Sequence, residues 1–297
     1  MNYDTCWRRL TTVYEADESK AIVRLVLDLR FGLSWTDIVC GKVEELSADE
    51  QRELELMMQR LETGEPVQYV LGVAEFGPRQ FHVEPGVLIP RPETYELCQW
   101  ILTLTPAKWK GRILDIGTGS GCIACTLAAE RPDAEVTAWD ISDAALRIAA
   151  VNAKRAHVLV SFEKTDVLQL EKASSPQTGT ADAPQSGRDD RWDVVVSNPP
   201  YICEKEKKTM ERNVVAHEPA LALFVPDHDP LLFYRAIARY AVRSLRPEGP
   251  LFFEINPLYA EEMKQMLRET GFSHVETRKD MFDKQRFMCA WKPFIKT

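Results

Sequence analysis

The chain has 297 residues, of which 37 are basic and 45 acidic, so its formal net charge is −8 and its pI is near 5.3. This length suggests one or two domains. The acidic balance disfavours a protein whose main partner is nucleic acid, because a phosphate-binding surface usually brings an excess of Lys and Arg. No apolar run approaches the roughly 18 residues of a membrane span, and the opening MNYDTCWRRL lacks the apolar stretch of a secretory signal. Membrane and secreted proteins are therefore excluded.

The first 72 residues predict a small helical domain. Two apolar sets recur at the spacing of a helix face. These sets are Ile22, Leu25, Val26 and Leu29, and then Leu54, Met57, Met58 and Leu61. Ser34 with Asp37, and Ser47 with Glu50, have the spacing of capping boxes, which mark helix starts. The segment contains no histidine, and we expect it to dock a partner rather than to carry chemistry.

Residues 73–93 predict a short hairpin that links two domains. Phe76, Phe81 and Val83 precede the apolar run at 86–89, as in paired strands. Two prolines then flank Arg91 and stiffen the chain where the second domain begins.

From residue 94 to residue 297, strand and helix patterns alternate, which is typical of a parallel sheet with crossover helices. The expected strands are Arg112–Ile116, Glu135–Asp140, Val158–Glu163, Asp193–Ser197, Leu251–Asn256, His274–Thr277 and Arg286–Trp291. The expected helices include Ala144–Arg155, Leu231–Leu245 and Tyr259–Thr270. The predicted fold class is thus α/β, an open seven-stranded and mostly parallel sheet beside a small N-terminal helical domain. Residues 172–190, rich in Ser, Pro, Thr, Gly and Asp, predict a disordered surface insertion.

The seven cysteines are odd in number and irregular in spacing, which indicates reduced thiols rather than a disulfide framework. Cys122 and Cys125 form a CxxC pair, but no second CxxC or Cys/His pair stands at zinc spacing. Both lie in an apolar helical stretch, where small buried thiols are common. We expect no metal site and a cytoplasmic location.

A glycine-rich loop follows the first strand of the predicted sheet. Gly117, Gly119 and Gly121 stand between the strand and an apolar helix, where glycine permits a tight turn and the close approach of a ligand to a helix N-terminus. A dinucleotide fingerprint would need a third glycine at position 122, which is cysteine, so a ligand without a pyrophosphate is favoured over NAD. Asp140, at the end of the next strand, is placed to bind a ribose diol.

The tetrapeptide Asn198-Pro199-Pro200-Tyr201 follows the fourth strand, and the carboxyl ends of central parallel strands border the ligand crevice. Proline has no N–H, so the polar groups left there are mostly acceptors. The Asn198 side-chain oxygen and the Pro199 carbonyl can each take one hydrogen of an –NH₂ group. Tyr201 offers a flat face to a planar substrate. Held in this way, the nitrogen lone pair of an amide or exocyclic amine turns towards an electrophile, and its growing positive charge is stabilised.

These motifs together resemble the class I S-adenosylmethionine-dependent methyltransferases that methylate nitrogen. The segments GEPVQYVLGVAEF (64–76), VEPGVLIPRPET (83–94) and HEPALALF (217–224) are similar to the release factor glutamine methyltransferases, and the resemblance covers nearly the whole chain. Three departures are the insertion at 172–190, FEIN (253–256), where a glycine-containing form is usual, and Pro230 in DHDPLLFY (227–234), where glycine is more usual.

The resemblance implies methylation of the side-chain amide of the glutamine in the Gly-Gly-Gln motif of class I release factors, which would be the protein partner. It implies these cofactor-binding residues: Gly117, Thr118, Gly119, Ser120 and Gly121 at the methionine end, Asp140 at the ribose, Asp166 and Val167 at the adenine, and Asn198. Asn198 and Pro199 would take the amide hydrogens, with Pro200 and Tyr201 completing the substrate pocket, and Asn198, Pro199 and Tyr201 would be catalytic. Arg91 and Glu93 would shape the site or pair at a hinge.

Three other functions remain open from the sequence. A ribosomal-protein glutamine methyltransferase would share every catalytic feature. A DNA adenine-N6 methyltransferase needs the same acceptors, but it must also extract a base and hold phosphates, and here the cluster Lys205, Lys207, Lys208 and Arg212 is equally a solvated helix face. A non-enzymatic binding module would not need an acceptor pair beside the crevice. His217 is expected to be structural rather than a base, with Glu218 and Pro219 shaping a wall of the pocket.

Overall fold

The computed structural model describes residues 1–173 and 191–294, which divide into two compact units. The smaller unit comprises Met1–Ala74, Val83–Pro85 and Met210–Glu218, and the larger comprises Glu75–His82, Gly86–Thr209 and Pro219–Thr297. The division falls inside a hairpin formed by β1 (Val73–Phe76) and β2 (Arg79–His82). The domain boundaries expected at residues 72 and 93 stay a prediction. Of the expected insertion at 172–190, the first two residues end α9 (Val167–Ala173), and the rest lies outside the described residues.

The smaller unit is helical. Its elements are α1 (Tyr3–Leu10), α2 (Ala16–Phe31), α3 (Trp35–Val39), the 3-10 helix η1 (Lys42–Glu45), α4 (Ala48–Glu62), α5 (Val67–Leu71) and α10 (Arg212–His217). Both expected capping boxes are confirmed. The Ser34 and Ser47 side chains accept from the third backbone N–H of α3 and α4, and the carboxylates of Asp37 and Glu50 accept from the backbone N–H of the two serines.

The apolar core of this unit confirms one predicted helix face and corrects the other. Leu54, Met57, Met58 and Leu61 of α4 are all buried. On α2, however, the buried apolar residues are Ile22, Val23, Val26 and Leu27. Leu25 is only partly buried and Leu29 is 38% exposed. Two of the four predicted positions, Leu25 and Leu29, are therefore wrong. The buried face contains Val23 and Leu27 instead, which are four residues apart and so lie on one side of the helix.

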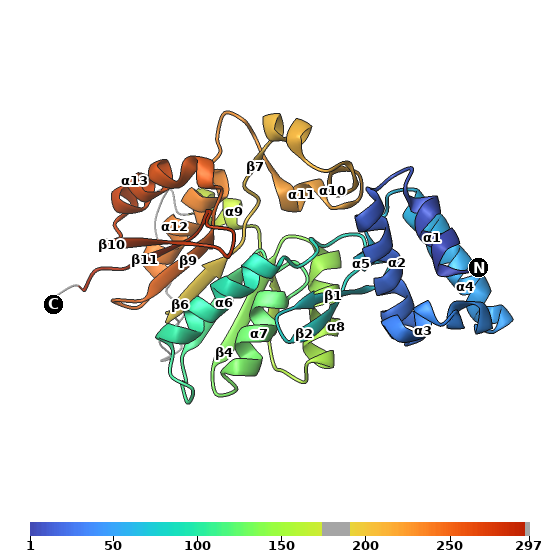
Figure 1. The fold of residues 1–297 in the computed structure, drawn as a ribbon. Coiled ribbons are helices and arrows are strands. Elements are labelled where there is room, and N and C mark those ends of the chain that lie inside the picture. The colour runs from blue at the N-terminus through green and yellow to red at the C-terminus, as the bar shows by residue number, and fades with distance from the viewer. Residues whose placement is uncertain (174–190, 295–297) are drawn as a thin grey trace. The chain divides into compact units, whose positions relative to one another are not determined.

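The larger unit is built on a seven-stranded sheet with the order β10-β11-β9-β6-β3-β4-β5 (Figure 1). The strands are β3 (Arg112–Ile116), β4 (Glu135–Asp140), β5 (Ser161–Lys164), β6 (Val194–Ser197), β9 (Pro250–Glu254), β10 (His274–Lys279) and β11 (Gln285–Trp291). β9, β6, β3, β4 and β5 are parallel, whereas β11 pairs antiparallel with both β9 and β10. The predicted seven-stranded, mostly parallel α/β sheet with a final hairpin is confirmed.

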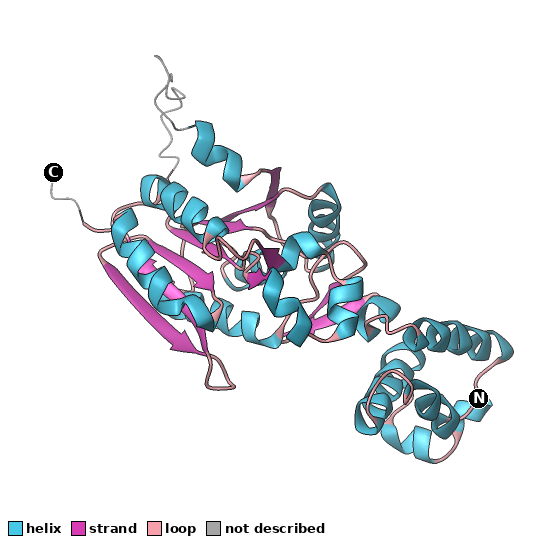
Figure 2. Ribbon diagram, turned by 90° about the horizontal axis from the view of Figure 1, so that it is seen from above, coloured by secondary structure: helices cyan, strands magenta, loops and turns pink. Residues whose placement is uncertain are grey.

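Helices cover both faces of this sheet, as Figure 2 shows by colour. They are α6 (Pro92–Leu104), α7 (Cys122–Glu130), α8 (Asp143–Arg155), α9, α12 (Leu232–Ser244) and α13 (Ala260–Thr270). Alternate residues of a strand face opposite sides, and the core follows this rule. Leu251 and Phe253 pack with α12 and α13, whereas Phe252 packs with α6 and α7. From Leu251 to Phe253, β9 is therefore apolar on both faces, as buried parallel strands are.

Short elements connect β6 to α12. They are β7 (Ile202–Cys203), η2 (Glu204–Thr209), α11 (Ala220–Leu223) and β8 (Phe224–Val225), and the 3-10 helix η3 (Pro257–Tyr259) precedes α13. β7 and β8 pair with each other outside the main sheet. These elements follow the predicted tetrapeptide in the chain.

Predicted strand boundaries hold for β3 and β4 but not for β5. The sequence predicts a start at Val158, whereas the structure starts the strand at Ser161. His157 has φ +55°, and the Val158 N–H donates to the Ala153 carbonyl at 3.0 Å. This left-handed turn closes the end of α8 and uses the residues that the apolar pattern assigned to the strand.

The order in which the chain adds strands to the sheet reverses between β3 and β6, and this reversal positions the site. From β3 the chain continues outwards through β4 to β5, whereas β6 lies on the other side of β3. Ile116 and Ser197 are register partners, so the loops that follow them leave the sheet side by side. Such a switch point is where open α/β sheets bind ligands. None of the helices in the described ranges has the length and hydropathy of a membrane span.

Asn152 of α8 anchors the glycine loop to the hairpin, and we expect its removal to destabilise the larger unit. Its side chain accepts from His82 N (2.7 Å) and donates to the carbonyls of His82 (2.9 Å) and Ser120 (2.8 Å). Asn152→Ala leaves buried groups unpaired and should lower the free energy of unfolding by about 2–4 kcal/mol in urea denaturation. Lys154→Ala, an exposed change in the same helix, is the control. An equal effect of the two changes would contradict this anchoring role.

Candidate active site

A cavity of about 390 Å³ lies at the carboxyl ends of β3, β4 and β6. Eight of the predicted site residues line it, namely Gly117, Gly119, Asp140, Asp166, Val167, Asn198, Pro199 and Pro200. Its volume falls in the range of small-molecule sites. The structure thus brings residues from four separate segments of the chain to one enclosed space.

Two glycines leave part of the cavity wall without side chains. Gly117 and Gly119 have φ of +75° and +55°, and a Cβ built on either would meet no atom within 4 Å. Both residues line the cavity, so these positions leave room for a ligand against the backbone. Gly121 differs, because a Cβ there would lie 2.9 Å from Ala149 Cβ. Glycine at 121 therefore lets α7 pack against α8, and it does not line the cavity.

Asp140 is held with both carboxylate oxygens partly used. Oδ2 accepts from Gly119 N and Oδ1 from Ser142 N, each at 2.9 Å. Each oxygen keeps a further lone pair for a hydroxyl of a ligand. Burial raises the pKa of Asp140, and the two backbone N–H groups oppose that rise. The arrangement suits a ribose diol, as expected from the sequence.

Asp166 and Val167 form the next part of the wall. Asp166 Oδ1 accepts from Leu168 N at 2.9 Å, which fixes the carboxylate at the start of α9. Val167 is 9% exposed and lines the cavity together with Thr165. An apolar surface next to a carboxylate can hold the face and the amino edge of a planar base.

Thr118 and Ser120 do not line the cavity and are buried behind it. Thr118 Oγ1 donates to Asp115 Oδ2 at 2.7 Å, and the Ser120 carbonyl accepts from Asn152. Asp115 is completely buried, and its Oδ1 has no hydrogen-bond partner among the described residues. Burial raises the pKa of Asp115 to about 7.

The tetrapeptide presents unused acceptors. The Ser197 hydroxyl donates to the Ile116 carbonyl at 2.6 Å and ties the two loops together. Within residues 1–173 and 191–294, no hydrogen bond is donated to Asn198 Oδ1 or to the Pro199 carbonyl. Both residues line the cavity. The acceptor pair expected from the sequence is thus available for a group with two N–H bonds.

Tyr201 is placed differently from the other three residues of the tetrapeptide. It does not line the cavity, and its hydroxyl donates to Glu254 Oε1 at 3.0 Å. Burial, and then the nearby Glu254 charge, raise the pKa of Tyr201. The flat face expected for a planar substrate is not part of this cavity. Its backbone is held as well, because Asn256 Nδ2 donates to the Tyr201 carbonyl at 3.2 Å.

Several wall residues were missed by sequence reasoning. Gly86, Val87, Leu88, Leu221, Ala222, Phe233 and Ile237 line the cavity. Apolar residues carry no chemical signal, so only the resemblance of 83–94 and 217–224 pointed to most of them. Of the two residues expected to shape a wall, Pro219 lines the cavity and Glu218 does not, and neither Arg91 nor Glu93 lines it. Thr94 and Glu254, both buried polar residues, were also missed, although a carboxylate inside the apolar run 251–255 was a visible signal.

The surroundings of the two CxxC cysteines and of Lys207 indicate structural roles. Burial raises the pKa of Cys122 and of Cys125 to about 12, so both remain thiols at neutral pH. No group of three or more His, Cys, Asp or Glu side chains within the described ranges is arranged to hold a metal ion. Lys207 pairs with Glu204 and lies 4.1 Å from the Phe224 ring centroid, which accounts for part of the basic cluster without nucleic acid.

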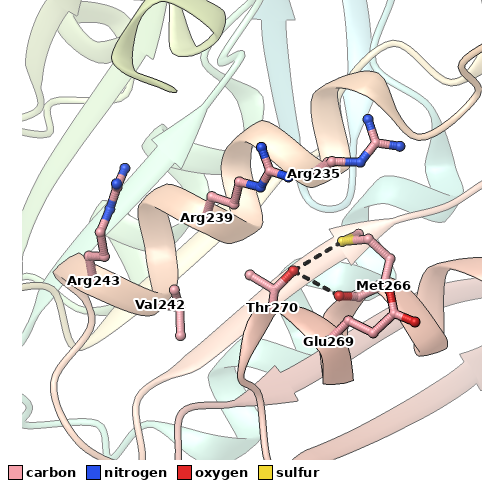
Figure 3. Close-up of a pocket in the computed structure, with 7 residues that line it drawn as sticks. All are labelled: Arg235, Arg239, Val242, Arg243, Met266, Glu269 and Thr270. Atoms are coloured by element: carbon pink, nitrogen blue, oxygen red, sulfur yellow. Dashed lines mark hydrogen bonds between the residues drawn. The ribbon is translucent and has the colours of Figure 1, made fainter. Parts of the chain in front are cut away.

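A second hollow lies between α12 and α13 (Figure 3). Arg235, Arg239 and Arg243 follow one face of α12, opposite Met266, Glu269 and Thr270. Asp229 binds Arg235 through two hydrogen bonds of 3.0 and 3.1 Å, and Glu269 adds a second negative charge. None of the predicted site residues lies here.

Comparisons with known proteins identify the family of the chain. Residues 98–221 match the family model "Methyltransferase small domain", and residues 8–72 match "PrmC N-terminal domain". The chain is 46% identical to the release factor glutamine methyltransferase of Bacteroides thetaiotaomicron, over 98% of this chain and 99% of the relative. It is 36% identical to that of Flavobacterium psychrophilum, over 97% of each.

A solved structure supports the fold. The T. thermophilus 16S rRNA N2 G1207 methyltransferase, in complex with AdoMet and guanosine, aligns with a TM-score of 0.51 at 21% identity. The alignment covers 74% of this chain and 49% of that chain. This likeness shows a shared fold.

The buried Asp115 should make stability depend on pH. Its folded-state pKa of about 7 lies above the ordinary 3.8, so the folded state binds the extra proton between these values. The free energy of unfolding therefore falls as pH rises through this window. Asp115→Asn removes this loss, so its stability relative to the wild type should increase by roughly 2–3 kcal/mol between pH 5 and pH 8. Urea unfolding without cofactor measures this difference.

The control for this experiment is Asp133→Asn, a change at an exposed aspartate after α7. Its stability relative to the wild type should be the same at pH 5 and pH 8. An Asp115→Asn difference that is also independent of pH would contradict a raised pKa at Asp115.

Proposed function

The chain belongs to the release factor glutamine methyltransferase family, and we propose that it methylates the side-chain amide nitrogen of the glutamine in the Gly-Gly-Gln motif of class I release factors. The observation that carries this proposal is the pair of unused acceptors, Asn198 Oδ1 and the Pro199 carbonyl, in a cavity that also holds Asp140. A primary amide has two N–H bonds, and these two acceptors can bind both. We also propose a cytoplasmic location, supported by seven free cysteines.

The cavity fits S-adenosylmethionine as methyl donor. Gly117 and Gly119 leave open space against the backbone, and Asp140 retains acceptor capacity for the ribose. Asp166 and Val167 would hold the adenine, and Gly117 and Gly119 would contact the methionine end, with Thr118, Ser120 and Gly121 supporting the loop from behind. When bound, this cofactor supplies an electrophilic methyl group on a sulfonium. Asn198 would border it on the substrate side.

Asn198 and Pro199 act on the nucleophile. The amide lone pair is delocalised into the carbonyl, so the nitrogen is a poor nucleophile until its hydrogens are fixed. With both hydrogens bound, the nitrogen keeps one orientation towards the donor, and the positive charge that grows on it is stabilised. Pro199 and Pro200 contribute no N–H donor that would compete. The product cation is acidic and loses a proton to solvent, so no general base is required.

The helical N-terminal residues, 1–72, are proposed to dock the release factor. Two features support this: the segment forms a core of its own in the smaller unit, and it contains no histidine. The substrate would then present the glutamine as an extended loop, because the 390 Å³ cavity also has to hold the cofactor.

A labelled-methyl transfer assay tests the substrate. We expect label from S-adenosylmethionine on a class I release factor, and none on the same factor with the Gly-Gly-Gln glutamine changed to glutamate, because a carboxylate has no N–H to donate. Duplex DNA and ribosomal proteins are offered in parallel. Label on either of these alone would contradict the release factor as substrate while leaving the acceptor pair intact.

Two substitutions should separate transfer from cofactor binding. Asn198→Ala removes one acceptor and should lower kcat by at least about 100-fold, with the Kd for S-adenosylmethionine nearly unchanged. Asp140→Ala removes a charged acceptor and should weaken cofactor binding by about 10- to 100-fold. Calorimetry gives the Kd and the labelled assay gives kcat. Loss of cofactor binding in Asn198→Ala equal to that in Asp140→Ala would refute this division of roles.

A further inference from the structure

A buried hydrogen-bonded chain lies directly behind Asn198. Asn198 Nδ2 donates to Thr94 Oγ1 at 3.3 Å, and Thr94 Oγ1 donates to Glu254 Oε2 at 2.6 Å. Thr94 is in the first turn of α6 and Glu254 is the last residue of β9. They are 3% and 2% exposed. Three segments far apart in the sequence thus converge on one amide.

The carboxylate of Glu254 acts as an acceptor through both oxygens. Oε2 takes the Thr94 hydrogen, and Oε1 takes the hydrogen of the Tyr201 hydroxyl at 3.0 Å. Burial raises the pKa of Glu254, whereas Thr94, the Arg286 charge and Tyr201 all lower it. Arg286 is itself held by Asp280 at 3.0 Å. Two hydroxyl donors therefore occupy the two oxygens of Glu254, and the charge of Arg286 lies nearby, while burial leaves the pKa of Glu254 raised overall.

The direction of these bonds fixes the Asn198 amide. A hydroxyl has a single hydrogen, and Thr94 donates that hydrogen to Glu254 Oε2. Thr94 Oγ1 can then only accept from Asn198. Of the two ends of an amide, only the nitrogen has hydrogens, so Nδ2 must face Thr94. Oδ1 is left on the other side, where it accepts from no described residue.

We propose that Thr94 and Glu254 are positioning residues that hold the Asn198 amide with its oxygen, and not its nitrogen, available to the substrate. This inference rests on the proposed function, because the oxygen is useful only if the substrate presents N–H bonds. An inverted amide would direct two donors at the donors of the substrate and would repel it. Neither Thr94 nor Glu254 lines the cavity, so both act through Asn198.

The test compares Thr94→Val, Glu254→Gln and Thr94→Ser. Valine keeps the shape of threonine but removes the hydroxyl. Glutamine can turn its –NH₂ towards Thr94, which frees the hydroxyl hydrogen to face Asn198 and invert the amide. We expect both to lower kcat for release factor methylation by at least about tenfold, with the Kd for S-adenosylmethionine changed less than about twofold. Serine keeps the hydroxyl and should restore most of the activity.

Thr103→Val is the matched control. Thr103 is an exposed threonine of the same helix whose hydroxyl donates to the Trp100 carbonyl, so its loss should leave kcat unchanged. A kcat of wild-type size in Thr94→Val or Glu254→Gln would overturn the proposal. So would a parallel loss of cofactor binding, or a fall in Thr94→Ser as large as in Thr94→Val, because either indicates a general structural role.

A second measurement does not depend on activity. In ¹H–¹⁵N spectra of the full chain with S-adenosylmethionine, the Asn198 side-chain amide is identified as the signal missing in Asn198→Asp. We expect this signal to move in Glu254→Gln and to stay in place in Thr103→Val. An unmoved signal in Glu254→Gln would overturn the proposal. If the wild type does not label the release factor, the substrate assignment fails, while this signal still reports the amide orientation.

Discussion

The pairing of β3 with β6 is the constraint on which the site depends. Their parallel register places Ile116 opposite Ser197, and the Ser197 hydroxyl adds a 2.6 Å bond to the Ile116 carbonyl. The glycine loop and the tetrapeptide begin at the next residue of each strand. This pair also marks the reversal of strand order, which is where open α/β sheets form a ligand crevice. The cofactor cavity and the acceptor pair are two consequences of one strand pairing.

Two buried carboxyl groups near the C-terminal ends of strands, those of Asp115 and Glu254, differ in how well their hydrogen bonds compensate for burial. Asp115 and Glu254 are 0% and 2% exposed, and burial raises the pKa of each. Glu254 is compensated by hydrogen bonds to both oxygens, whereas Asp115 keeps one oxygen without a described partner. A completely satisfied network rigidifies its surroundings, and an unpaired buried acceptor is costly. The satisfied network around Glu254 lies behind Asn198, whose amide must keep one orientation. The partly unpaired Asp115 lies beneath the glycine loop, beside Asp140.

Much of the fold could be predicted from the sequence, because local patterns decide it. The bounds of β3 and β4, both capping boxes and the final hairpin follow from alternation, cap spacing and turn residues. Leu29 was misplaced because two overlapping apolar faces fit α2, and Val158 because a left-handed turn at His157 overrides strand propensity. Thr94 and Glu254 could not be paired, since 160 residues separate them. The displacement of Tyr201 from the cavity is a consequence of that same unpredicted carboxylate.

Two different features keep hydrogen-bond donors away from the acceptor pair: the prolines at 199 and 200, and the hydrogen-bonded chain behind Asn198. An acceptor pair for an –NH₂ group works only if no donor stands beside it. At Pro199 and Pro200 the covalent structure removes the N–H groups, and no further support is needed. At Asn198 the side chain has a donor and an acceptor of nearly equal size, so a hydrogen-bonded chain must choose between them. Asn256 donates hydrogen bonds to the Tyr201 carbonyl and to Glu206 and so holds the C-terminal end of the tetrapeptide in place. In the proposed function, such a site would distinguish glutamine from glutamate by hydrogen-bond polarity, because the two side chains have nearly the same shape and only the amide can donate to both acceptors.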